Sequence, residues 1–249
     1  MADSARNLDG KTTLVTGASR GVGKVTATML AERGSNVVIN YRSKAKRAEQ
    51  VAGEVEAHGV KSLIVEADVT DATAVAKMFD RVREAFGSLD ILVLNASGGL
   101  EKDVAEEYAM LLNRDSQVDL VKAALPILTD GGRIVFVTSH LAHFHGEKPV
   151  MEEYEPVAAS KKAGEVALRE MIPALTAKGI SLVVVSGDLI DGTITPKLLN
   201  RLRPGIIEGR REQAGGWLPT TEDFAGAIVK AAGDAGMKTG DIVYVGSID

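Results

Sequence analysis

The chain has 249 residues, of which 45% are hydrophobic and 25% charged, and its formal net charge is −5. This composition is that of a globular protein, and the acidic balance argues against nucleic acid or a membrane as a partner. The absence of cysteine excludes disulfides, thiolate catalysis and cysteine-based zinc sites. The N-terminal segment lacks the apolar region of a secretory signal peptide, and the apolar runs are too short to span a bilayer. We therefore expect a cytoplasmic protein.

The first distinctive stretch is residues 12–23, with the sequence TTLVTGASRGVG. Its apolar start predicts the end of a buried strand, and a helical pattern follows over residues 24–33. Between them lies a turn with the glycines Gly17, Gly21 and Gly23. Such a turn lets backbone N–H groups approach a phosphate, and a helix N-terminus adds a partial positive charge. The Gly-x3-Gly-x-Gly spacing differs from G-x-G-x-x-G, so the stretch alone also fits an ordinary strand-to-helix turn.

Short β-branched runs then alternate with helical patterns along the chain. Further strands are expected at residues 37–39, 62–65, 91–94, 133–138, 181–185 and 242–245. Helices are expected at residues 44–58, 72–86, 104–128 (two helices meeting near Leu112), 157–177 and 221–235. Apolar strands separated by helices are typical of a parallel sheet that is buried on both faces. With right-handed crossovers, this predicts a Rossmann-type doubly wound α/β fold with a seven-stranded parallel sheet, in a single domain over residues 1–249.

Ligands of such folds bind beyond the carboxyl ends of the strands. The second strand is followed by Arg42 and Ser43, where a cofactor with a free ribose hydroxyl would favour an acidic residue. Arg42, together with Arg20 in the glycine turn, suits a 2′-phosphate, because guanidinium groups bind phosphate oxygens in a fork. The alternative is two solvated surface arginines. We expect NADP(H) to be preferred over NAD(H).

Other polar residues follow the strands or lie in the helices. They are Asp68, Asn95, Ser97, Asn113, Ser139, Lys161 and Lys162. Taken singly, Asp68 and the Asn95 turn also fit ordinary turn chemistry. A lone serine at a strand end is usually without a special role.

Together, these residues make the chain resemble the short-chain dehydrogenase/reductase family over essentially its whole length. TGASRGVG is similar to the family's TGxxxGxG cofactor turn, which implies cofactor contacts for Gly17, Ser19, Arg20, Gly21, Val22 and Gly23. The resemblance also covers the adenine-contacting Asp68-Val69, the N-A-G-like Asn95-Ala96-Ser97, the helix asparagine Asn113, the catalytic Ser139 and the Ser160-Lys161 pair. It implies an oxidoreductase that acts on a small carbonyl or alcohol. Lys161 would hold the ribose, and Asn113 would tie the lysine into a hydrogen-bond relay.

The sequence departs from the family where the chemistry takes place. The catalytic tyrosine of the family should lie four residues before Lys161, but position 157 is valine. The Pro-Gly that usually follows the sixth strand is replaced by Ser186-Gly187, in which Gly187 would still contact the cofactor. Valine has no proton to donate, so the proton would come from Tyr154, a histidine of residues 140–145, water or the substrate itself.

Tyr154 is the first candidate for this proton donor. It precedes Lys161 by seven residues, which is roughly 20° short of two helical turns. If the helix extended that far, the two side chains would share a face. Pro156 favours a helix start near itself, which places Tyr154 just outside the helix. A partly exposed loop tyrosine is the alternative.

The second candidate is the histidine-rich run that follows Ser139. It holds His140, His143 and His145, three of the four histidines of the chain. Histidine titrates near neutrality, so His143 is a possible proton donor. A metal site on this run would lack an obvious carboxylate partner, and we expect no metal.

The sequence thus predicts an NADP(H)-dependent short-chain dehydrogenase/reductase with an atypical proton donor. The alternatives are a non-catalytic NADP(H)-binding sensor or partner-binding protein, and an enzyme of another class, such as an isomerase or lyase, on the same fold. Residues 193–218 are expected to cover the substrate. By resemblance alone, the chain should form a homodimer or homotetramer through the helices that contain Asn113 and Lys161.

Overall fold

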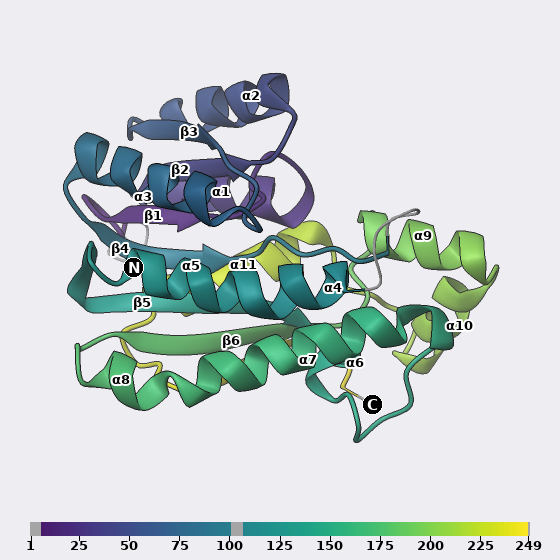
Figure 1. Ribbon diagram of the computed structural model, residues 1–249. Helices are drawn as coiled ribbons and strands as arrows, with labels where there is room; N and C mark the ends of the chain where they lie inside the picture. The colour runs from purple at the N-terminus through teal and green to yellow at the C-terminus, as the bar shows by residue number, and fades with distance from the viewer. Residues whose placement is uncertain (1–5, 101–106, 249) are drawn as a thin grey trace.

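The computed structural model describes residues 6–100 and 107–248. Its centre is a sheet of seven parallel strands in the order β3-β2-β1-β4-β5-β6-β7 (Figure 1). The strands are β1 (Thr12–Val15), β2 (Asn36–Tyr41), β3 (Ser62–Glu66), β4 (Leu89–Leu94), β5 (Leu128–Ser139), β6 (Ser181–Gly187) and β7 (Ile242–Val245). The predicted Rossmann-type doubly wound fold, with seven parallel strands, is confirmed.

Helices cover both faces of this sheet. They are α1 (Gly21–Glu32), α2 (Ala45–Glu56), α3 (Ala72–Phe86), α4 (Tyr108–Met110), α5 (Ser116–Ala124), α6 (His140–His143), α7 (Glu155–Glu170), α8 (Ile172–Thr176), α9 (Ile194–Leu202), α10 (Ile206–Gln213) and α11 (Thr221–Gly233). A π-helix, η1 (Leu111–Asp115), joins α4 to α5, and a 3-10 turn, η2 (Glu152–Tyr154), precedes α7. Helices α1, α2 and α11 pack on one face, and α3, α5, α7 and α8 pack on the other.

The alternation of side chains along each strand creates the two core layers. In β5, Val135 and Val137 face the α1 and α11 side, whereas Ile134 and Phe136 face the α3 and α5 side. Successive side chains of a strand point to opposite faces, so a strand that is apolar at every position must be covered twice. The helices meet this need with apolar stripes such as Val75, Met78, Phe79 and Val82 of α3.

Two of the predicted helices differ most from the observed ones. The single helix expected over residues 157–177 begins at Glu155 and ends at Glu170, and α8 follows as a separate helix. Pro173 lies in the first turn of α8, where the missing proline N–H costs nothing because that position has no helical acceptor. Proline therefore starts a new helix instead of continuing the old one.

The helical segment expected over residues 104–128 is divided by η1 and ends earlier. Residues 104–106 lie outside the described part, and α5 ends at Ala124. Leu128 was expected to be helical but is the first residue of β5, which is longer than the predicted 133–138. The short helix α6 lies in the histidine-rich run, where no helix was expected.

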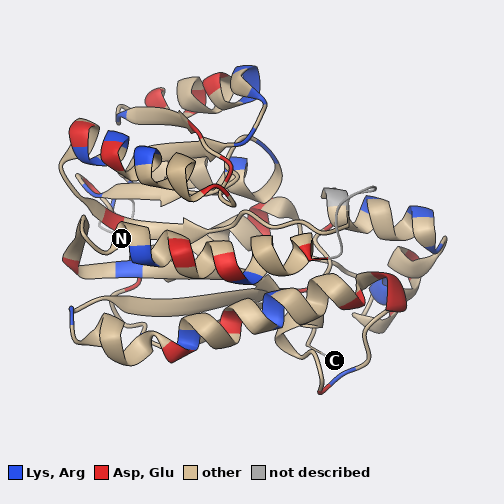
Figure 2. Ribbon diagram, viewed as in Figure 1, with Lys and Arg blue, Asp and Glu red and all other residues tan. Residues whose placement is uncertain are grey.

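The strand order reverses between β1 and β4, because consecutive strands lie on opposite sides of this point. In open α/β sheets, ligands bind beyond the carboxyl ends of the strands at such a switch point. Figure 2 shows charges of both signs interspersed along the helices that face the viewer. Among the described residues, no helix is long and apolar enough to cross a membrane.

Candidate active site

The glycine turn after β1 forms a cradle for a phosphate at the start of α1. Gly17 and Gly21 have positive φ angles of 65° and 54°, a region that side-chain-bearing residues rarely adopt. A Cβ on Gly23 would lie 2.6 Å from the carbonyl oxygen of Gly17. The first turn of α1 holds no acidic residue, so the backbone N–H groups at its N-terminus can bind an anion. These features fit the pyrophosphate of a dinucleotide.

Two buried side chains that sequence reasoning missed hold this turn in place. Asn40, at the end of β2, accepts a hydrogen bond from Gly17 N at 3.2 Å and donates to Ala67 O at 3.0 Å. Thr16 accepts hydrogen bonds from the backbone N–H groups of Asn95 and Ala96, both at 2.9 Å. The signal for both was a polar residue at the end of an otherwise apolar strand.

The predicted adenosine residues lie at the ends of β2 and β3. Arg42 is exposed, and its Nη1 lies 4.0 Å from Asp68 Oδ2. Asp68 itself accepts hydrogen bonds from the backbone and hydroxyl of Thr70, at 2.9 and 2.8 Å. Ser43 and Arg20 are also exposed, and Val69 is buried. Two cations thus flank the strand ends, although Asp68 partly offsets the charge of Arg42.

The segment that follows β4 lies against the start of the glycine turn. The side chain of Asn95 donates to Thr16 O at 2.8 Å. Ala96 is half-buried and Ser97 is exposed. The chain therefore approaches the glycine turn closely, and a Cβ on Gly17 would lie 3.3 Å from Ala96 Cα.

Asn113 lies in the π-helix η1 and is 1% exposed. Its amide nitrogen donates to Gly98 O at 2.9 Å and to Ser160 Oγ at 3.0 Å, and its oxygen accepts from Gly98 N at 3.3 Å. The side chain thus joins the segment after β4 to α7, and its α7 partner is Ser160, next to Lys161. Gly164 permits this packing, because a Cβ there would overlap the carbonyl of Asn113. Single π-turns are frequent at functional sites.

Tyr154 and Ser139 meet at the carboxyl end of β5. The two hydroxyl oxygens are 3.3 Å apart, and Tyr154 is 4% exposed. Ser139 Oγ also accepts from Ala142 N at 3.3 Å, which caps α6. Because Pro156 lies in the first turn of α7, Tyr154 precedes the helix, as the proline position indicated. The alternative of a partly exposed loop tyrosine does not fit this burial.

Burial controls the proton affinity of the groups around this pair. It raises the pKa of Tyr154 above its usual value of 10.0, although the hydrogen bond to Ser139 acts in the opposite direction. Burial lowers the pKa of Lys161 from 10.5 to about 8. Within the described residues, the ammonium group of Lys161 makes no hydrogen bond or ion pair. The site therefore holds a neutral phenol and a lysine that remains mostly charged at neutral pH.

Val157, four residues before Lys161, is 4% exposed, and a Cβ on Gly99 would lie 3.2 Å from its Cγ2. Val157 belongs to an apolar cluster that includes Tyr154, Leu189, Leu199 and Ile207.

The side chains of His140 and His143, which follow Ser139, hydrogen-bond groups other than Ser139. His143 Nδ1 lies 2.8 Å from Glu165 Oε2, and its Nε2 lies 3.1 Å from the hydroxyl of Tyr244. His140 Nδ1 lies 2.8 Å from Ser186 Oγ, and burial lowers the pKa of His140 to about 4. Both ring nitrogens of His143 are therefore occupied away from Ser139, which favours Tyr154 as the acid. In the described part of the chain, no group of three or more His, Asp or Glu could hold a metal.

The predicted covering segment, residues 193–218, contains α9 and α10. Arg210 of α10 forms a bidentate ion pair with Asp188, which follows β6, at 2.8 to 3.1 Å. Arg211 pairs with Asp191 at 3.0 Å. Sequence reasoning missed both pairs, because charges so far apart give no local signal. Gly187, predicted at the cofactor, is buried under Phe224, whose ring a Cβ would contact at 2.6 Å, so packing alone also requires glycine there.

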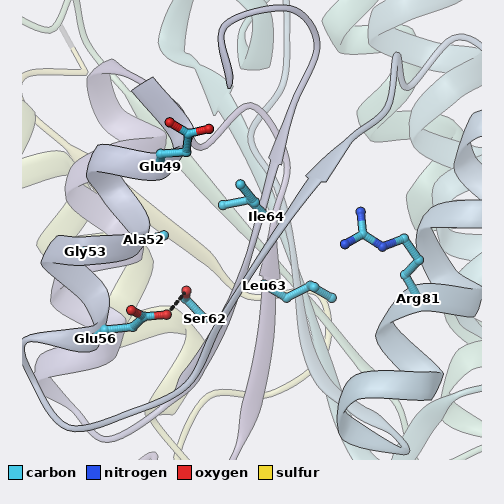
Figure 3. A pocket seen from close by; sticks show the side chains of 8 residues that line it. All are labelled: Glu49, Ala52, Gly53, Glu56, Ser62, Leu63, Ile64 and Arg81. Carbon is cyan, nitrogen blue, oxygen red and sulfur yellow. Dashed lines mark hydrogen bonds between the residues drawn. The ribbon is translucent and has the colours of Figure 1, made fainter. Parts of the chain in front are cut away.

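A surface hollow of about 420 Å³ lies beside the edge strand β3, away from the site described above (Figure 3). Its walls come from α2, the beginning of β3, and Arg81 of α3. It contains none of the predicted site residues and faces the amino end of β3 rather than its carboxyl end. We assign the functional site to the carboxyl edge, where the glycine turn, Ser139 and Tyr154 lie.

Comparison with known proteins agrees with this geometry. Residues 11–201 match the family described as short chain dehydrogenase. A 1-cyclohexenylcarbonyl-CoA reductase from Streptomyces collinus is 31% identical over 240 residues, which cover 93% of this chain and 84% of the relative. The hydroxynaphthalene reductase-like protein Arp2 from Metarhizium brunneum is 38% identical over 150 residues. That match spans 58% of this chain and little more than half, 56%, of the relative.

Solved structures give the same result. A short chain dehydrogenase from Burkholderia cenocepacia in complex with NADP has 30% sequence identity and a TM-score of 0.81, with 96% of this chain and 97% of that chain covered. The promiscuous reductase LugOII has 28% identity and a TM-score of 0.83, with coverage of 97% and 99%. Fold, motif order and sequence agree over most of the chain. This protein belongs to the short-chain dehydrogenase/reductase family.

Proposed function

We propose that this protein is an NADP(H)-dependent reductase of carbonyl compounds in which Tyr154 replaces the usual catalytic tyrosine. The observation that carries the proposal is the 3.3 Å contact between the hydroxyls of Tyr154 and Ser139, both at the carboxyl end of β5. A general acid must lie within hydrogen-bond reach of the oxygen that it protonates. A carbonyl oxygen that bonds Ser139 would be within reach of Tyr154.

When bound, NADPH supplies the hydride, and the protein supplies orientation and electrostatics. The glycine turn and the start of α1 would hold the pyrophosphate. Lys161 would bind the ribose and add positive potential beside the substrate oxygen. Ser139 would orient that oxygen by donating a hydrogen bond.

Tyr154 would transfer its hydroxyl proton to the substrate oxygen. Its raised pKa keeps it protonated at neutral pH, which suits an acid in the reductive direction. The lysine charge would stabilise the phenolate that forms, because opposite charges lower the cost of ionisation in a buried site. The apolar cluster around Tyr154 would exclude water from this step.

Three further observations support parts of the proposal. Arg42 and Arg20 suit a 2′-phosphate, and two related structures were solved in complex with NADP or NADPH. Several relatives are named reductases. Leu111 of η1 and Val166 of α7 are exposed apolar residues, at 42% and 46%, which supports pairing of two copies through the helices that carry Asn113 and Lys161.

A non-catalytic NADP(H)-binding protein is the rival, and Val157 is the observation in its favour. The experiment measures NADPH oxidation with a panel of apolar ketones and quinones for the wild type, Tyr154→Phe and Tyr41→Phe. Tyr41 is a matched control, because its partly buried hydroxyl bonds only weakly to Glu66, at 3.5 Å. We expect Tyr154→Phe to reduce kcat about 10²-fold or more, with Tyr41→Phe near wild type. Tight NADPH binding without turnover of any carbonyl by the wild type would support the rival.

A further inference from the structure

The side chain of Arg42 connects two distant parts of the cofactor edge. Arg42 follows β2, and its Nη1–H donates a hydrogen bond to the hydroxyl of Tyr108 at 2.6 Å. Tyr108 is the first residue of α4, 66 positions later in the chain. In the sheet order, β2 and β4 lie on either side of β1. The contact therefore links the segments on the two sides of the glycine turn.

This contact restrains a side chain that would otherwise be mobile. The side chain of Arg42 is 56% exposed, and its Nη1 lies 4.0 Å from Asp68 Oδ2. A solvated arginine loses much rotamer freedom when a ligand immobilises it. The bond to Tyr108 restricts this freedom before any ligand binds, so less is lost on binding.

The chemistry of the partner also matters. Asp68, at 4.0 Å from Arg42 Nη1, offsets part of the guanidinium charge. A carboxylate in place of the Tyr108 hydroxyl would offset more of it and compete with an anionic ligand. The phenol of Tyr108 accepts one hydrogen bond without a formal charge, and it leaves the remaining N–H groups of the arginine to donate. A guanidinium offers five donors in a rigid fork that matches phosphate oxygens.

We propose that Tyr108 is a positioning residue for Arg42, and that it thereby contributes to selection of the 2′-phosphate of NADP(H) over the free 2′-hydroxyl of NAD(H). This inference rests on the proposed preference for NADP(H). It adds to the adenosine site a residue from α4 that the glycine-turn and strand-end motifs do not include.

The test is a titration of NADPH and NADH, followed by nucleotide fluorescence, with no turnover required. Tyr108→Phe removes only the hydroxyl that holds Arg42. We expect the Kd for NADPH to rise about two- to tenfold, the cost of immobilising one long side chain, and the Kd for NADH to stay unchanged. Tyr41→Phe, which removes a neighbouring tyrosine hydroxyl that bonds Glu66 instead, should leave both values unchanged.

A double-mutant cycle separates this inference from the proposed preference for NADP(H) on which it rests. In an Arg42→Ala background, Tyr108→Phe should have no further effect, because the residue that it positions is gone. An effect that persists there, or an equal effect on NADPH and NADH, or none in either background, would overturn the positioning role. If Arg42→Ala itself fails to weaken NADPH relative to NADH, the proposed cofactor preference fails instead.

Discussion

The hydroxyl of Tyr154 lies 3.3 Å from that of Ser139, although Tyr154 precedes Lys161 by seven residues rather than four. The geometry follows from the chain entering α7. Pro156 lies in the first turn of that helix, and Tyr154, in the preceding 3-10 turn, is buried among apolar side chains beside β5. A hydroxyl can thus reach Ser139 from outside the helix.

Replacement of Ser139 tests the group that would orient the substrate. We expect Ser139→Ala to reduce kcat about 10²-fold, as the loss of one preorganised donor does in other enzymes, while the Kd for NADPH stays near wild type. The change also removes the cap of α6, with a cost of about 1 kcal/mol, so thermal unfolding should be measured in parallel. Unchanged turnover would remove Ser139 from the mechanism.

Gly23→Ala tests the phosphate cradle. The new Cβ would lie 2.6 Å from Gly17 O and 2.7 Å from Asn95 Nδ2, so the turn has to shift. We expect NADPH affinity to fall at least tenfold, measured by fluorescence titration. Gly53→Ala is the matched control, because this helical glycine of α2 has open space around its Cβ position. That variant should bind normally and gain up to about 1 kcal/mol of stability.

Lys161→Met tests the cost of the buried charge. Because the folded-state pKa is about 8 and the ordinary value is 10.5, the unfolded chain holds more protons on this lysine between these pH values. Stability should therefore rise with pH through this window, and the full cost should be present below it. We expect Lys161→Met to raise the free energy of unfolding at pH 7, by on the order of 3 kcal/mol at most. Denaturant unfolding should show this gain shrinking toward pH 10.5, and equal or lower stability of the variant at pH 7 would contradict the account.

The ion pair between Asp188 and Arg210 is expected to anchor the covering segment. Asp188 is 4% exposed in its side chain, so Arg210→Met would leave a buried carboxylate without its bidentate partner, at a cost of about 3–5 kcal/mol. Limited proteolysis should then cleave residues 193–218 faster than in the wild type. Arg201→Met, on an exposed position of α9, is the control. Equal cleavage of both variants and the wild type would mean that the ion pair does not hold the segment.

The fold could be predicted because its signals are local. Apolar runs such as Leu182–Val185 stand between helical patterns, and the glycines of residues 17–23 mark one type of turn. The helix boundaries near Leu128 and Pro173 were less predictable, because a change from helix to strand within an apolar segment depends on tertiary pairing. Helix and strand propensities alone do not locate such a boundary.

The site was predictable only in part. Ser139, Asn113 and Lys161 could be named from motif order, but the partner of Asn113 proved to be Ser160. Tyr154 could be proposed but not placed, because its direction depends on a turn before a proline. Tyr108 and Arg210 gave no signal at all, since their partners Arg42 and Asp188 lie 66 and 22 positions away.

The most direct test of the central claim is a crystal structure of the protein with NADP⁺ bound. The account predicts that the hydroxyls of Tyr154 and Ser139 both face nicotinamide C4 across a space for one carbonyl oxygen, within about 3 Å of each. A structure in which only Val157 and other apolar atoms face the nicotinamide would contradict it. The protein would then be better described as a binder of NADP(H) than as a reductase.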